Sequence, residues 1–227
     1  VNNIRLPSAP MCVVSARYIY ELIKSLPNIS DKLDLILITN GGDTNAPIRI
    51  VNLLRCFFKE INVILPYRCY SAGTLLALGC DNIIMHANSN LGPIDPSINS
   101  PHNVDVQGRI LPSINVEEIR SYFSFVKDDV CIKSEEGLFK ALDKLTNRIS
   151  PIALGAVKQG ILHAKLVAEN LLMLSGKYNY FQRKKIIKRL SSDFFFHSYP
   201  ITANEVMKNV GLKVIKTDEL NKTNFNF

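Results

Sequence analysis

The chain has 227 residues, of which 47% are hydrophobic and 21% charged, close to the averages of globular proteins. This length fits one α/β domain with a helical extension, and such a domain buries a core without disulfide or metal support. The formal net charge is +7, and no stretch approaches the roughly 18 uninterrupted apolar residues of a membrane span, so we expect a soluble chain.

Helices and strands are predicted to alternate in the first half of the chain. The apolar spacing favours a helix over residues 16–26, with Tyr18, Leu22 and Leu26 on one face. Residues 33–39 follow as a nearly continuous apolar run, which is typical of a strand covered on both faces.

Two further helix and strand pairs follow. Residues 44–60 predict a helix and residues 62–66 the next buried strand, which together make a βαβ unit with a right-handed crossover. Residues 71–80 form a short helix without a single charge, which must be buried, and residues 82–86 form a strand. The inward positions of the longer helix are Ile48, Val51, Leu54 and Phe58.

The second half is predicted to be mainly helical. Residues 99–114 are rich in Pro, Asn, Ser and Gly and indicate a mobile loop, a candidate lid or substrate rim. We predict a single domain over residues 1–227, with an α/β core at about 15–98 and a helical part at about 115–215. Its expected helices are 116–129, 135–147, 151–174, 183–193 and 203–210, before a short strand at 212–215.

The cysteines argue against a disulfide framework and against a zinc site. They form an odd set without a C-x-x-C pair, and no signal-peptide pattern follows Val1. We therefore expect a cytoplasmic protein without metal or organic cofactor, while a membrane anchor outside this sequence stays open. The five are Cys12, Cys56, Cys69, Cys80 and Cys131.

Basic residues gather on one predicted helix near the end of the chain. They could attract an acidic partner, but a solvated helix face is the simpler interpretation because no nucleic-acid motif is present. We expect no nucleic-acid binding. The residues are Arg183, Lys184, Lys185, Lys188 and Arg189.

Ser71 lies between a buried strand and the first residues of the uncharged helix. The free N–H groups and the dipole at a helix N-terminus stabilise negative charge, and the small residues Ala72 and Gly73 let a substrate approach. This placement suits a nucleophile, although a plain helix cap fits the local residues equally well. The segment lacks the first glycine of G-x-S-x-G, so an α/β-hydrolase is not supported.

Gly41 and Gly42 follow a buried strand just as Ser71 does, so both loops should lie at the same edge of the sheet. Glycine frees backbone N–H groups to point at an oxyanion, and the N–H of Ala72 could supply another donor. The alternative is a plain turn with Asp43 as a helix cap.

Three ordered blocks resemble the serine dehydrogenase proteinase (SDH) family of the Clp/crotonase superfamily, which also contains signal peptide peptidase A. The blocks are LILITNGGD (residues 35–43), PYRCYSAGTL (residues 66–75) and LGPIDP (residues 91–96). Residues 151–155 and 197–202 are similar to the C-terminal pattern of the family. The resemblance implies a Clp/crotonase-like spiral of ββα units, a backbone oxyanion hole, peptide hydrolysis through Ser71, and a homo-oligomer.

The general base is ambiguous in this sequence. In Clp proteases a histidine follows the serine by about one strand, where this chain has Asp95, a residue that also suits a turn. Signal peptide peptidases use a lysine, and Lys158 on a long apolar helix is the first candidate. Lys127 and Lys133 are alternatives that look exposed.

His197 is the other candidate base, because Phe194, Phe196 and Tyr199 surround it with aromatic bulk. The Clp catalytic aspartate aligns near Ser198, so an acid partner for this histidine is expected to be missing.

The sequence thus predicts a serine peptidase, with Ser71 as nucleophile, Gly41, Gly42 and Ala72 as oxyanion donors, and Lys158 or His197 as base. One alternative is an inactive scaffold that binds peptides, favoured by the missing histidine. Another is a crotonase-like acyl-thioester enzyme, which uses two backbone N–H groups without a nucleophilic serine.

Overall fold

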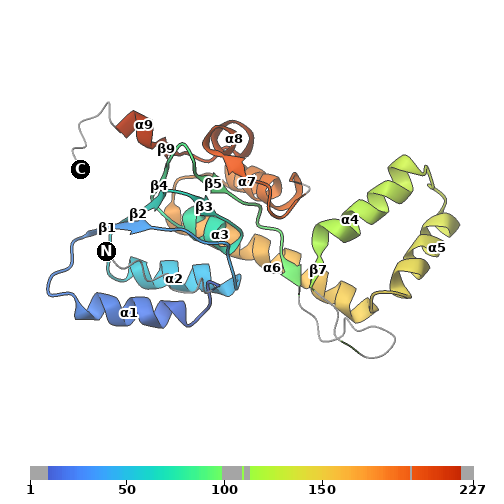
Figure 1. The fold of residues 1–227 in the computed structure, drawn as a ribbon, viewed down its shortest axis with the longest axis horizontal. Coiled ribbons are helices and arrows are strands. Elements are labelled where there is room, and N and C mark those ends of the chain that lie inside the picture. The colour runs from blue at the N-terminus through green and yellow to red at the C-terminus, as the bar shows by residue number, and fades with distance from the viewer. Residues whose placement is uncertain (1–9, 99–108, 110–112, 195, 221–227) are drawn as a thin grey trace, which may run out of the picture.

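The computed structural model describes residues 10–98, 109, 113–194 and 196–220 of the chain. It consists of an α/β body and a helical arm that projects from one end of the body (Figure 1). The arm contains α4 (Val116–Ser124), the π-helix η1 (Phe125–Asp129) and α5 (Glu135–Thr146). The N-terminal half of α6 (Pro151–Ser175) connects the arm to the body.

A parallel sheet forms the centre of the body. Its strands are ordered β1-β2-β4-β9, and Leu33 of the first strand lies opposite Ile61 of the second. The predicted βαβ units are confirmed, and the last predicted strand is found slightly later in the chain. The bounds are β1 (Lys32–Ile36), β2 (Glu60–Leu65), β4 (Asn82–Met85) and β9 (Ile215–Lys216).

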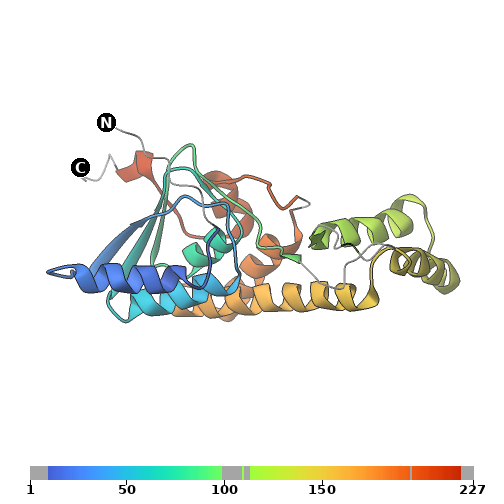
Figure 2. The same cartoon turned by 60° about the horizontal axis from the view of Figure 1, so that its bottom comes forward.

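Helices α1 (Ser15–Ser25), α2 (Asn45–Arg55) and α6 lie side by side below the sheet (Figure 2). Helix α3 (Ala72–Leu78) contacts both α2 and α6, and all seven of its residues are buried, as its uncharged sequence predicts. Helix α7 (Tyr180–Ser192), which follows α6 in the chain, packs against it.

The body also contains short strands outside the central sheet. A second sheet has the order β3 (Arg68–Cys69), β5 (Asn90–Leu91) and β8 (Ile201–Thr202). Strands β6 (Ser97–Ile98) and β7 (Ile114–Asn115) pair antiparallel at the base of the arm. The remaining elements are α8 (Ala203–Glu205), the π-helix η2 (Val206–Val210) and α9 (Thr217–Leu220).

The prediction that the first strand is covered on both faces is wrong. Strand β1 is the edge of the sheet, its side chains alternate between partly buried and exposed, and Ile36 is 69% exposed. On α1 the side that packs inward carries Ile23, whereas the predicted apolar face, with Tyr18 and Leu22, is open to solvent. A continuous apolar run does not reveal whether a neighbour within the chain covers both of its faces.

The predicted loop at residues 99–114 lies almost entirely outside the described residues, and only its last residues enter β7. Within the described part of the chain, no helix, including the 25-residue α6, is long and apolar enough to cross a membrane.

Candidate active site

Ser71 stands in a strained backbone conformation at the junction of β3 and α3. Its φ is 52° and its ψ is −111°, a region that residues with a side chain rarely occupy. The hydroxyl does not cap the helix, and Ser71 is partly exposed while the nine residues after it are buried. The chain therefore holds one hydroxyl at the surface of an otherwise buried helix start.

The diglycine loop lies directly against Ser71. A Cβ built on Gly41 would come within 2.8 Å of the Ser71 Cβ and 2.9 Å of the Tyr70 carbonyl oxygen, and Gly41 has a φ of +105°. Thr39 donates its N–H to the Arg68 carbonyl and so holds the two loops in register. The predicted convergence of the two loops is observed, and it requires glycine at position 41.

The backbone N–H groups around Ser71 differ in whether they already donate a hydrogen bond. Gly41 donates its N–H to the Thr39 hydroxyl at 3.0 Å, so this donor is already engaged. Ala72 is the first residue of α3, and its N–H has no acceptor within the helix. Among the described residues no acceptor pairs with the Gly42 N–H either, although Met11 packs closely against Gly42.

Thr74 connects the start of α3 to the segment after β5. Its buried hydroxyl lies 2.8 Å from the Gly92 carbonyl oxygen and 3.0 Å from the Cys69 carbonyl oxygen, and it accepts the Gly92 N–H at 3.1 Å. Gly92 also lies against Tyr70, where a Cβ would meet the ring at 2.9 Å. Leu91 and Gly92 therefore run alongside the segment that carries Ser71.

The buried Asp95 and the partly exposed His197 form a pair on neighbouring segments. The antiparallel register of β5 and β8, with Leu91 opposite Ile201, brings the chain after β5 alongside the chain before β8. The His197 Nδ1 lies 3.1 Å from Asp95 Oδ1, and Asp95 is 2% exposed. The hydrogen bond to Asp95 raises the pKa of His197, against the opposing effect of burial.

The expectation that His197 lacks an acid partner is therefore wrong. The acid was expected at the position of Ser198, and Asp95 also suited a turn, but it is Asp95 that supplies the carboxylate. The two residues lie 102 positions apart, so only the pairing of β5 with β8 brings them together. The position of Asp95 in the block one strand after Ser71 was the signal in the sequence.

The candidate lysines lie on the helical part of the molecule. Lys158 is exposed on α6, and Lys127 and Lys133 are exposed on the arm. A fourth lysine, which the sequence did not single out, is partly buried on α6: burial, followed by the charges of Arg120 and Lys158, lowers the pKa of Lys165.

The sequence of the chain is similar to those of known proteins. Residues 11–111 match the model of the ClpP-like SDH-type serine proteinases. The uncharacterized proteins MJ0137 and MJ1495 of Methanocaldococcus jannaschii are 32% and 31% identical to this chain, over 86% and 80% of it. The matches cover 57% and 51% of those proteins, so the chain spans little more than half the length of these relatives.

A solved structure shares the fold. A mutant of the 1510-N membrane-bound stomatin-specific protease, in complex with a substrate peptide, superposes with a TM-score of 0.50 and 18% identity, over 95% of this chain and 76% of that one. The architecture is therefore a Clp/crotonase-like α/β fold, in line with the match to a ClpP-like family. The predicted resemblance to the SDH family is confirmed, because residues 11–111 match the model of the ClpP-like SDH-type serine proteinases.

Proposed function

We propose that the chain is a serine peptidase whose nucleophile is Ser71. The match to a family of serine proteinases supports the reaction class, and the strained Ser71 beside the diglycine loop supports the nucleophile. The observation that carries the proposal is this juxtaposition of one hydroxyl, a helix N-terminus and a second loop that a side chain at Gly41 would block.

We place His197 as the general base and Asp95 as the residue that orients it. Asp95 binds the Nδ1 of His197, which leaves Nε2 to take the proton from Ser71, and its carboxylate stabilises the imidazolium that forms. Residues 91–96, which contain Asp95, lie against the Ser71 segment through Thr74 and Gly92. The proposal requires Nε2 to reach hydrogen-bond distance of the Ser71 hydroxyl in the substrate complex.

The oxyanion donors follow from the hydrogen bonds already made. We assign the N–H groups of Gly42 and Ala72 to the oxyanion, because no described residue accepts from them. Gly41, whose N–H is bound to Thr39, contributes by leaving room beside Ser71, and it would donate to the oxyanion once its bond to the Thr39 hydroxyl oxygen is broken.

In this mechanism the Ser71 Oγ attacks the carbonyl carbon of the scissile peptide bond and its proton passes to His197. The imidazolium then gives the proton to the leaving amine, so the C–N bond breaks and an acyl-enzyme remains. Water, deprotonated by the same histidine, attacks the acyl-enzyme and releases the carboxylic product. The tetrahedral oxyanion of each step is bound by the Gly42 and Ala72 N–H groups.

A lysine base is the second candidate. In the 1510-N protease, the mutant solved with a substrate peptide carries an alanine in place of a lysine. Lys158 would take that role here, with Lys127 and Lys133 as further choices. We favour His197 because its acid partner is buried and lies three residues after Gly92, which contacts the Ser71 segment, whereas Lys158 is exposed on α6.

The partners proposed for the enzyme are a peptide or protein substrate and further copies of the same chain. Exposed apolar side chains on α1 and the edge strand support self-assembly, since a second copy would bury them. The cytoplasm is the proposed compartment, in line with the free cysteines. These apolar residues are Tyr18, Leu22, Leu26, Ile36 and Ile38.

A fluorophosphonate probe tests the proposal, because it labels only activated serines. We expect the wild-type chain to be labelled, Ser71→Ala to lose the label, and the exposed control Ser30→Ala to keep it. Absence of labelling in wild-type protein whose folding is verified by circular dichroism would favour an inactive scaffold instead.

A further inference from the structure

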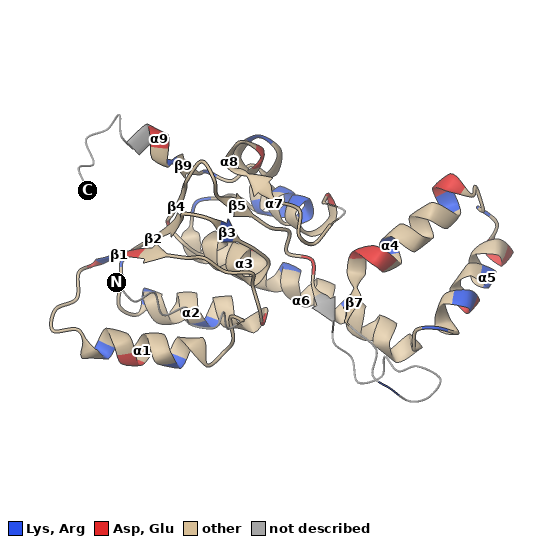
Figure 3. Ribbon diagram, viewed as in Figure 1, with Lys and Arg blue, Asp and Glu red and all other residues tan. Residues whose placement is uncertain are grey.

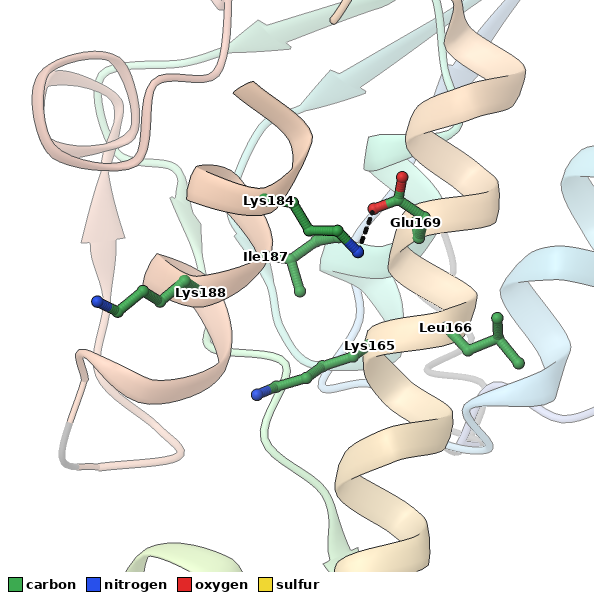
Figure 4. Close-up of a pocket in the computed structure, with 6 residues that line it drawn as sticks. All are labelled: Lys165, Leu166, Glu169, Lys184, Ile187 and Lys188. Carbon is green, nitrogen blue, oxygen red and sulfur yellow. Dashed lines mark ion pairs between the residues drawn. The ribbon is translucent and has the colours of Figure 1, made fainter. Parts of the chain in front are cut away.

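A second site is suggested by a cavity of about 330 Å³ between α6 and α7, which Ser71 does not line. Three lysines line it, together with one carboxylate and two apolar side chains (Figure 4). In this view Lys165 projects from α6 toward α7, and Lys184 faces Glu169 across the gap between the helices. The full lining is Lys165, Leu166, Glu169, Lys184, Ile187 and Lys188.

The charges in this cavity are not balanced. The carboxylate of Glu169 is already held by Arg183, whose Nε lies 2.8 Å from Oε1, and Lys184 reaches its other oxygen only at 3.6 Å. Among the described residues no acidic group pairs with Lys165 or with Lys188. The cavity therefore carries more positive than negative charge.

Lys165 also feels positive charge from outside the cavity. Burial, followed by the charges of Arg120, which is paired with Glu117, and of Lys158, lowers the pKa of Lys165. Figure 3 shows the same concentration of basic residues along α7, on the side of the body that faces away from α1. Holding several ammonium groups in a concave site is unfavourable unless an anion compensates them.

We propose that this cavity binds a small polyanion, a molecule that carries phosphate or clustered carboxylate groups. Lysine ammonium groups suit such a ligand because each is a compact charge with three rotatable donors. The volume lies at the lower end of the range of small-molecule sites, and Ile187 offers apolar contact to the ligand body. This site is independent of peptide hydrolysis, so it stands or falls separately from the proposed function.

The test is calorimetric titration of the whole chain with inorganic pyrophosphate and, in parallel, with citrate, at matched ionic strength. We expect at least one of the two to bind, and their relative affinities identify phosphate or carboxylate as the preferred group. Lys165→Gln and Lys188→Gln should each weaken binding about tenfold, the effect of losing one charge-assisted contact.

Lys185→Gln is the matched control, because Lys185 is an exposed lysine on the same helix that does not line the cavity. It should leave the affinity unchanged. The proposal is overturned if neither polyanion binds more tightly than chloride. It is also overturned if Lys185→Gln weakens binding as much as Lys188→Gln does. Lys188 is exposed, so misfolding of the Lys188→Gln variant would not explain a loss of binding.

Discussion

The α/β body and the helical arm both contain helices but differ in what these helices bury. Every residue of α3 is buried between α2 and α6, whereas Ala141 is the single buried residue of α5. The arm has a separate small core at its base, formed by Ile114, Val116, Ala153 and Val157. The difference indicates that the rigid part of the molecule is the part that positions Ser71, while the arm offers surface.

Removing a large side chain from each region tests the difference between the body and the arm most strongly. Leu76→Ala in the body should lower the free energy of unfolding by about 2–5 kcal/mol, because Leu76 is 2% exposed and its loss leaves a cavity. Phe139→Ala in the arm should change it by less than about 0.5 kcal/mol, because that ring is 70% exposed. Urea unfolding curves of the two variants check this, and equal losses would contradict the distinction.

Thr74 tests whether the body holds the site together. Thr74→Val keeps the shape but removes the hydroxyl that binds Gly92, and should cost about 1–3 kcal/mol of stability because the Gly92 carbonyl oxygen loses its buried donor, while the Gly92 N–H keeps only its bond to the Cys69 carbonyl oxygen. It should also lower kcat more than it raises KM, since the Asp95 segment shifts relative to Ser71. Thr74→Ser, which keeps the hydroxyl, should restore kcat; the idea fails if both variants behave alike.

The Asp95→Asn variant tests the site in the body through the pH dependence of stability and activity. Asp95 raises the pKa of His197, so the pair stabilises the fold in full below the unfolded-state pKa of about 6.5, and this contribution is lost as the pH rises through the folded-state pKa. The stability difference between wild type and Asp95→Asn should therefore be larger at acidic than at alkaline pH. The acidic limb of the kcat/KM profile should move to lower pH in the variant, and an unmoved limb would remove His197 from the mechanism.

The smallest effect is expected for an ion pair on the arm. Glu136→Gln breaks the bond to Lys140, in which both side chains are more than 70% exposed, and should cost less than about 0.5 kcal/mol. Thermal unfolding of this variant in low and high salt measures the effect, and a loss of several degrees would mean that the arm is more tightly packed than its exposure indicates.

The site was predictable wherever its residues are local in sequence. The uncharged run at residues 71–80 requires a buried helix, and two glycines after a strand require a tight turn at the same sheet edge, so Ser71 and Gly41 could be brought together from pattern alone. Asp95 and His197 could not, because their contact depends on the register of two short strands far apart in the chain.

The fold was also predictable only in its local features. Helix and strand positions follow from apolar spacing, and most are confirmed to within a few residues. The apolar spacing of α1 shows that Tyr18 and Leu22 share a face, but it does not show which face packs inward or whether this chain or a second copy covers the apolar one. The same ambiguity explains the edge strand β1 and its exposed Ile36.

The identity of the base is the central claim, and hydrolysis of a fluorogenic peptide by two variants tests it most directly. If Asp95 and His197 activate Ser71, His197→Ala should lower kcat by about 10²–10⁴-fold, while Lys158→Ala should leave kcat unchanged. The reverse result, with activity lost on removal of Lys158 and kept without His197, would contradict this account.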